Sequence, residues 1–169
     1  MQISAPRIVG PQDGKAGSLG SIGVRFMIDT EETHDGGFSL VEHPMPPRAL
    51  AAPLHKHSRE DEYSYVLEGR MGALLGDDEV YAQAGDLVFK PRDQWHTFWN
   101  AGDEPCRILE IIAPGGFENF FDELVDAGAS GPPEPEWLAE CGARYGLEFN
   151  FESVPELCEK YGLTFGNAA

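Results

Sequence analysis

The chain has 169 residues, of which 41% are hydrophobic, so it is long and apolar enough to fold around its own core rather than remain disordered. It carries 29 acidic against 12 basic residues, a formal net charge of -17. So acidic a surface repels phosphate backbones and anionic lipids, which argues against nucleic acid and membranes as partners.

Three widely spaced cysteines, Cys106, Cys141 and Cys158, form no C-x-x-C pair, which argues against a disulfide framework or a zinc knuckle. The first residues show no basic segment followed by an apolar run, and no apolar stretch reaches the roughly 20 residues that a membrane span needs. We therefore expect free thiols and a cytoplasmic protein.

Residues 1–20 are rich in Gly, Pro and Ser and are expected to form an N-terminal arm. Residues 21–113 consist of short apolar or alternating runs separated by turn residues. The expected strands are 22–28, 38–43, 54–57, 63–67, 71–75, 79–82, 87–89, 96–100 and 107–112. Many short strands at regular spacing predict an all-β sandwich or barrel.

The composition changes after residue 113, and residues 114–169 are expected to form a C-terminal helical extension. Five apolar residues near its start share one helical face: Phe117, Phe120, Phe121, Leu124 and Val125. This spacing predicts an amphipathic helix, which we expect to pack its aromatic face on the outside of the barrel. An aromatic box for a cofactor is the alternative.

A short repeat follows, because residues 143–149 and 159–165 share the pattern Tyr-Gly-Leu-x-Phe at a 16-residue offset. Gly146 and Gly162 are placed to end a short helix, where a left-handed backbone is easy for glycine. Two copies are too few for a solenoid. We expect the repeat to cap the barrel or a dimer; a partner-binding motif is the alternative.

The most informative residues are three histidines and one glutamate. His55, His57 and Glu62 fall within eight residues and are followed by Gly69. A second segment begins at Gly85 and contains Pro91, His96 and Asn100. Two histidines at i and i+2 project to the same face of a strand, which is unusual because buried imidazoles need partners.

These two segments resemble the conserved motifs of the cupin superfamily, H-x-H-x4-E-x6-G and G-x5-P-x4-H-x3-N. The resemblance implies a jelly-roll barrel in which His55, His57, Glu62 and His96 hold one divalent transition metal. Three imidazoles and a carboxylate suit Fe, Mn, Ni, Co, Cu or Zn alike. Two motif glycines are replaced, by Ala49 and by Asp93, and aspartate tolerates a left-handed turn better than most residues.

Side chains alternate between the two faces of a strand, so residues an even number of positions from a predicted ligand should also point inward. The residues that share the inward parity, and so are candidates for the wall of a substrate pocket, are Ser64, Val66, Phe98 and Asn100. Tyr63, Tyr65 and Trp99 are expected to face outward or to lie in a dimer contact. His34 and His43 are interpreted as non-ligands, and Glu60 would replace Glu62 if Glu62 were not a ligand.

The segment 114–121 also resembles small single-domain cupins similar to bacterial quercetin dioxygenases. This implies a dioxygenase-like oxidoreductase that acts on a small aromatic or enolic molecule, with Glu62 as ligand and as acceptor of a substrate proton. The alternatives are a metal-dependent isomerase, epimerase or lyase, and a non-catalytic module that binds a small molecule. The family also implies a homodimer.

Overall fold

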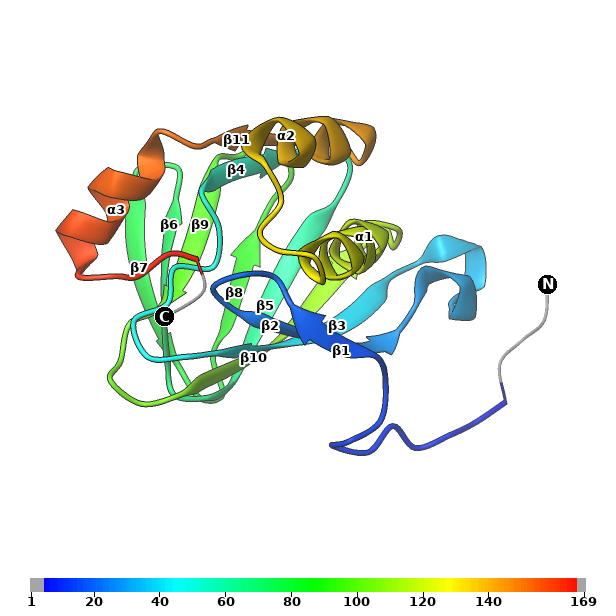
Figure 1. The fold of residues 1–169 in the computed structure, drawn as a ribbon. Helices are drawn as coiled ribbons and strands as arrows, with labels where there is room; N and C mark the ends of the chain where they lie inside the picture. Colours follow the sequence, from blue (N-terminus) through cyan, green and yellow to red (C-terminus); the bar gives the residue numbers. More distant parts are fainter. Residues whose placement is uncertain (1–4, 167–169) are drawn as a thin grey trace.

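A computed structural model describes residues 5–166, and its strands form two antiparallel sheets that face each other (Figure 1). The first sheet has the order β1 (Ala16–Ser18), β2 (Gly23–Ile28), β3 (Ser39–Met45), β10 (Cys106–Ala113), β5 (Asp61–Glu68) and β8 (Leu87–Lys90). The second has the order β11 (Leu147–Asn150), β4 (Leu54–His57), β9 (His96–Asn100), β6 (Arg70–Leu75) and β7 (Asp78–Gln83). The predicted jelly-roll barrel with short C-terminal helices is confirmed.

The barrel interior divides into an apolar part and a polar part. Strand β10 alternates strictly between buried and half-buried residues, which directs Ile108 and Glu110 inward. Ile108 lies opposite His43 of β3 and Val66 of β5, so successive strands place their inward residues in rows. Val66 and Ile108 belong to the main apolar core, whereas the row containing Glu62 belongs to the site.

The N-terminal arm contributes a strand to the first sheet. Ala16 of β1 lies opposite Arg25 of β2, so the stretch expected to be irregular extends the sheet by one edge strand. Two single-turn 3-10 helices, η1 (Thr30–Glu32) and η2 (His34–Gly36), connect β2 to β3. The ends of the expected arm and extension, residues 1–4 and 167–169, lie outside the described residues. The division at residues 20 and 113 stays a prediction.

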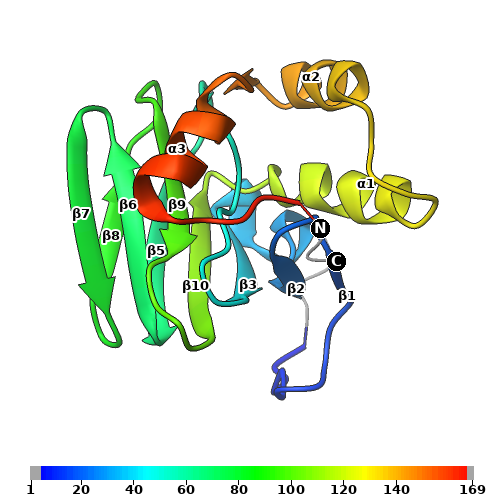
Figure 2. The same ribbon diagram turned by 60° about the vertical axis from the view of Figure 1, so that its left-hand side comes forward.

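Three helices follow the barrel: α1 (Glu118–Gly128), α2 (Pro135–Arg144) and α3 (Ser153–Tyr161). Helices α1 and α2 lie together at one end of the two sheets, and α3 lies beside the sheet that contains β6 and β9 (Figure 2). No helix among the described residues is long and apolar enough to span a membrane.

The position of α1 corrects the expectation that its aromatic face packs on the outside of the barrel. The chain leaves β10 beside β5, where Ala113 lies opposite Asp61, and the next turn carries it across the barrel mouth. The Phe117 ring then packs edge-on against the His57 ring, with centroids 4.4 Å apart. Within α1, the Phe121 ring packs edge-on against His43 of β3, with centroids 5.2 Å apart, so the apolar face of the helix points into the barrel.

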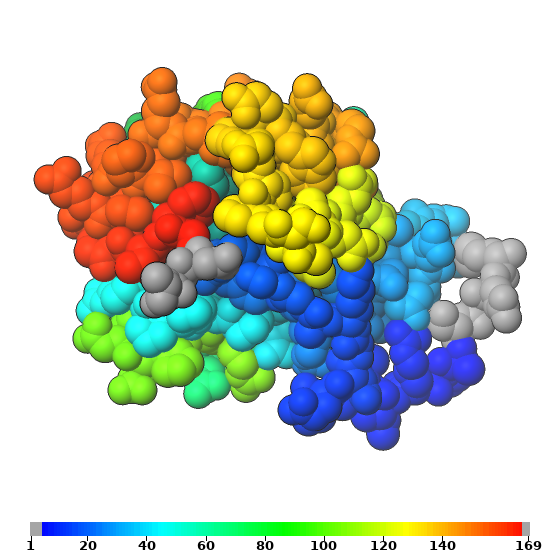
Figure 3. All heavy atoms as spheres, in the orientation of Figure 1, coloured from blue at the N-terminus to red at the C-terminus, as the bar shows by residue number. Residues whose placement is uncertain are grey.

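The two repeat copies both lie on the barrel. Gly146 and Gly162 adopt the predicted left-handed backbone, with φ of 72° and 64°. Beyond Gly146 the chain becomes β11, which pairs with β4 and sets Phe149 opposite His55. Beyond Gly162 the chain pairs at Thr164 with Ala49. Figure 3 shows the extension, coloured yellow to red, covering much of one face.

Candidate metal centre

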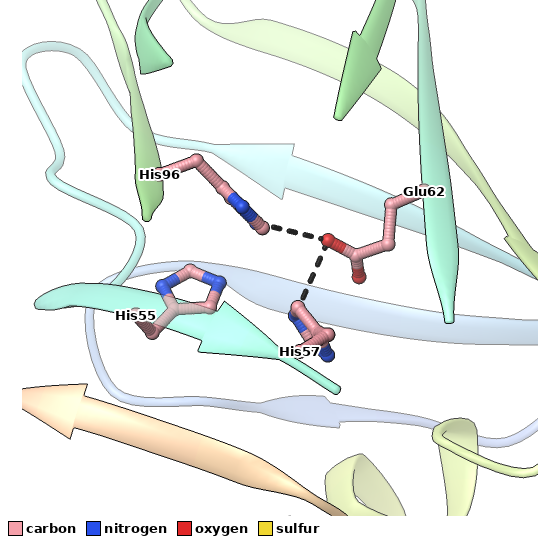
Figure 4. Close-up of side chains that lie close together, drawn as sticks. All are labelled: His55, His57, Glu62 and His96. Atoms are coloured by element: carbon pink, nitrogen blue, oxygen red, sulfur yellow. Dashed lines mark hydrogen bonds and ion pairs between the residues drawn. The ribbon is translucent and has the colours of Figure 1, made fainter. Parts of the chain in front are cut away.

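The four predicted ligand residues come together inside the barrel from three strands (Figure 4). His55 and His57 lie two residues apart on β4, and His96 of β9 lies directly opposite His55. Glu62 reaches the same point from β5 in the opposite sheet. Each residue offers a ligand atom within 4.8 Å of the others, and all four side chains are buried.

One carboxylate oxygen of Glu62 is the centre of the group. Glu62 Oε2 lies 3.3 Å from His57 Nε2 and 3.2 Å from His96 Nε2. The His55 ring stands beside the His96 ring, with centroids 4.4 Å apart. The imidazole nitrogens and the carboxylate oxygen therefore converge on one small volume. A metal site requires its ligand atoms to converge in this way.

Backbone carbonyls set the tautomers of two of the histidines. His55 Nδ1 lies 2.8 Å from the Pro53 carbonyl oxygen, and His96 Nδ1 lies 3.1 Å from that of Gln94. A carbonyl oxygen only accepts, so Nδ1 carries the proton in both rings and donates it. Nε2 then presents a lone pair to the site, as in histidines whose outer nitrogen is anchored for metal binding.

These contacts test whether the residues fit a metal. Both ring nitrogens of His57 are buried and have no hydrogen-bond partner in the described part of the chain. In the neutral His96 ring, the Nε2 lone pair faces an oxygen of Glu62, two acceptors that repel unless a cation lies between them. The four side chains therefore fit a divalent metal ion, and they do not select one metal over another.

Burial also keeps the site ready to bind a cation. Burial lowers the pKa of His55 well below its usual value, and the neighbouring His96 and His57 lower it further. The pKa of His96 is lowered mainly by burial as well. Burial would raise the pKa of Glu62, but the interactions with His57 and Lys90 outweigh it and hold that pKa well below the usual value. These directions favour neutral His55 and His96 and an ionised Glu62, which are the forms of these side chains that ligate a metal.

Two charged residues beside the site were missed by sequence reasoning. Lys90 Nζ lies 2.9 Å from Glu110 Oε1 and 3.5 Å from Glu62 Oε2, and Lys90 and Glu110 are buried. The Ser64 hydroxyl donates a 2.7 Å hydrogen bond to Glu110 Oε2. The available signal was a charged residue at an inward position of an otherwise apolar strand, in 87–90 and again in 108–112.

A cavity of about 540 Å³ lies against the centre, and His55, His57 and Glu62 form part of its wall. Most of the remaining wall is aromatic or aliphatic. The extension supplies a large share of it: Phe117, Phe120, Phe121, Leu124, Val125, Leu138, Leu147, Phe149, Phe151 and Phe165. A second hollow of about 480 Å³, between the arm and α1, contains none of the four ligand residues.

The four predicted pocket residues occupy different places. Phe98 lines the cavity. Ser64, Val66 and Asn100 do not line it: Ser64 is bonded to Glu110, and Val66 is packed in the apolar core. The Asn100 side chain donates hydrogen bonds to three backbone carbonyls, including that of Met45 at 3.1 Å, and so ties a loop to the barrel. Alternation along a strand thus predicts which side chains point inward, but not whether an inward side chain lines the cavity or packs in the core.

The other parity predictions concern residues outside the ligand group. Tyr65 is 40% exposed, and Tyr63 stacks on Phe89 of the neighbouring strand. Trp99 points away from the barrel interior but is buried, because α3 places Tyr161 in a stack against it with centroids 4.4 Å apart. Glu60 lies behind His57, with 3.7 Å between Glu60 Oε2 and His57 Nδ1, and is not part of the ligand group.

Comparison with known proteins agrees with this architecture. The family model for the cupin domain matches residues 42–112, which include the four candidate ligand residues. This chain belongs to the cupin superfamily. The crystal structure of the polyketide cyclase RemF from Streptomyces resistomycificus is similar, with 31% identity and a TM-score of 0.55. That alignment covers 65% of this cupin and 80% of RemF.

Two curated proteins are similar in sequence. The oxalate-binding protein of Thermotoga maritima is 26% identical over 66% of this cupin and 88% of that protein. The tetracenomycin polyketide synthase protein TcmJ of Streptomyces glaucescens is 32% identical over 36% of this cupin. The match spans only 40% of the length of TcmJ.

Proposed function

We propose that this cupin is a metal-dependent enzyme of the dioxygenase type that acts on a small aromatic or enolic molecule. The observation that carries the proposal is that His55, His57 and Glu62 of the ligand group lie in the wall of a cavity whose remaining lining is mostly aromatic and aliphatic. A volume of about 540 Å³ suits a small organic molecule. Aromatic walls favour a flat, unsaturated body, and the ligand group favours one acidic oxygen on it.

Different residues would bind the metal, accept the substrate proton and enclose the substrate. His55, His57, His96 and Glu62 would hold the metal, which when bound supplies Lewis acidity and open positions for an oxygen atom. Glu62 would also accept the proton of the substrate hydroxyl, since its carboxylate is ionised and lines the cavity. The phenylalanine wall would exclude water and hold the ring system of the substrate.

A second function is a metal-dependent cyclase, isomerase or lyase that needs no oxygen. The likeness to the polyketide cyclase RemF supports it, because such a reaction would use the same cavity and the same acidic oxygen. A third function, binding without catalysis, is supported by the likeness to the oxalate-binding protein. The apolar wall favours a larger and less polar ligand than oxalate.

One experiment separates these three functions. The protein is loaded in turn with Fe²⁺, Mn²⁺, Co²⁺, Ni²⁺, Cu²⁺ and Zn²⁺ and incubated with flavonols, catechols and enolic polyketide analogues, in air and under nitrogen. Oxygen uptake coupled to substrate loss supports the dioxygenase. Turnover under nitrogen supports the second function, and binding without turnover supports the third. Glu62→Gln should abolish turnover; Glu68→Gln, on the same strand but exposed, is the matched control.

Two further properties stay proposals. We place the protein in the cytoplasm, which the three free cysteines support because no disulfide stabilises the described chain. We also propose a homodimer, supported by exposed apolar side chains on the edge strand β8, where Leu87 is 55% and Phe89 is 49% exposed.

A further inference from the structure

A fourth buried histidine, His43, lines the same cavity but does not belong to the ligand group. It lies on β3, opposite Ile108 of β10, and is only 1% exposed. Its ring packs against the edge of Phe121, with centroids 5.2 Å apart, and lies 6.3 Å from Phe98. Both phenylalanines also line the cavity, so His43 is a polar group set in an aromatic wall.

One nitrogen of His43 has a partner and the other has none. Nδ1 lies 2.9 Å from the carbonyl oxygen of Gly23, so Nδ1 carries the proton and donates it. No hydrogen bond joins Nε2 to any residue that the structure describes. Burial lowers the pKa of His43 to about 4, so the ring is neutral at physiological pH and Nε2 is a hydrogen-bond acceptor.

The free acceptor belongs to a residue of the cavity wall, so a ligand that fills the cavity would cover Nε2, and covering a polar atom without giving it a partner costs free energy. The hydrogen bond to Gly23 uses only Nδ1 of His43. Nε2 of this wall residue can therefore accept a hydrogen bond from a ligand in the cavity. The group that satisfies Nε2 must be a donor that enters the cavity. A neutral imidazole suits a hydroxyl group, since its lone pair accepts a hydrogen bond from a neutral donor.

We propose that His43 Nε2 forms a second polar subsite, which accepts a hydrogen bond from a hydroxyl group of the bound molecule. The cavity would then select molecules with two oxygens: an acidic one at the ligand group and a hydroxyl at His43. This inference rests on the proposed function only for the first of these anchors. It narrows the substrate class from aromatic or enolic molecules to those with at least two hydroxyl or enol groups.

The test measures binding rather than turnover, so it stands whether or not the protein is an enzyme. The full chain is loaded with Zn²⁺, which has no redox chemistry. Isothermal titration calorimetry then compares naphthol, with one hydroxyl, and a set of dihydroxynaphthalene isomers. The variants are His43→Phe, which removes the acceptor, and His43→Gln, which keeps one. His34→Phe is the matched control, because His34 is exposed and outside the cavity.

Wild type should bind at least one dihydroxynaphthalene isomer more tightly than naphthol. His43→Phe should weaken that isomer about tenfold, near the upper range for one hydrogen bond, and change naphthol less than about twofold. His43→Gln should restore part of the preference, and His34→Phe should match wild type. Metal content should be unchanged in all three.

Three results would overturn the subsite. The first is a wild type that binds no isomer more tightly than naphthol, including one that binds neither. The second is an equal loss for both probes in His43→Phe, which would indicate general packing. The third is loss of zinc in both His43 variants, which would indicate a role in building the centre. Absence of turnover in air and under nitrogen would instead refute the enzyme and leave the subsite in place.

Discussion

The ammonium nitrogen of Lys90 lies 2.9 Å from Glu110 and 3.5 Å from Glu62, so one buried cation joins two buried carboxylates inside the barrel. It also lies 4.5 Å above the centre of the Phe98 ring. Burial would lower the pKa of Lys90, but Glu110 and Glu62 outweigh it and raise that pKa. Burial raises the pKa of Glu110 to about 7 despite Lys90. Lys90 is therefore the charge that allows two carboxylates to be buried together, Glu62 in the candidate metal centre and Glu110 beside it.

Replacing Lys90 by Met should destabilise the metal-free protein by about 3–5 kcal/mol, the usual cost of removing one partner from a buried ion pair. Urea unfolding measures this loss. Adding Glu110→Gln should recover a large part of it, because one uncompensated carboxylate is then gone. Arg107→Met is the control: its ion pairs are partly exposed and should contribute less than about 1 kcal/mol. Equal losses for Lys90→Met and Arg107→Met would contradict the role given to Lys90.

His55→Ala and His96→Ala should each abolish metal retention while the barrel stays folded, because the apolar core lies apart from the ligand group. Elemental analysis of the purified proteins measures metal, and circular dichroism checks the fold. The exposed His34→Ala serves as the control. Wild-type metal content in either ligand variant would refute the assignment.

His43 should make stability depend on pH. An unfolded histidine is protonated below a pH of about 6.5, whereas folded His43 stays neutral down to about 4. The unfolded state thus binds more protons in this window, and the stability contributed by the neutral ring is lost as the pH falls through it. Between pH 7 and pH 5, metal-free wild type should lose about 2 kcal/mol more than His43→Gln. Urea unfolding at the two pH values checks this, and parallel losses would show that His43 ionises freely in the folded protein.

Phe149→Ala should widen the cavity beside the ligand group. Phe149 lines the cavity and its ring centroid lies 6.2 Å from that of His55. Binding of naphthol should weaken several-fold through lost contact, binding of a larger flavonol should weaken less, and metal content should not change. Calorimetry on the zinc-loaded protein gives both affinities. Phe38→Ala, at an exposed residue outside the cavity, is the control and should leave both affinities unchanged. An identical loss of affinity for naphthol and the flavonol in Phe149→Ala would argue that Phe149 does not select ligands by size.

The edge strand β8 should mediate dimer formation. Phe89 and Tyr65 are exposed on neighbouring strands, and a charged side chain there would oppose burial against a second copy. Sedimentation should show a dimer for wild type and a monomer for Phe89→Lys. Phe38→Lys, at an exposed residue just before β3 and three strands away from β8 in the sheet, should remain dimeric. A monomeric wild type would end the dimer proposal, and a dimeric Phe89→Lys would move the interface elsewhere.

Much of the candidate site follows from local rules. His55 and His57 share a face because side chains alternate along a strand, and Glu62 is the second residue of the next strand. Asp93 holds the left-handed turn expected where the motif has glycine, with φ of 63°. Gly146 and Gly162 end their helices as predicted. Each of these features depends on residues close together in the chain, so the sequence by itself determined them.

Long-range packing decided the rest. Whether the aromatic face of α1 lies outside the barrel or across its mouth depends on which apolar surface is within reach, and helical spacing is the same in both cases. Lys90, Glu110 and Glu62 meet because β8, β5 and β10 pair in one register, which no local pattern specifies. Alternation along β3 directs His43 inward like a core residue, and only the assembled structure places it in the wall of a cavity. Strand parity assigns a side chain to a face, but contacts between distant segments determine whether that face is packed, charged or open to a ligand.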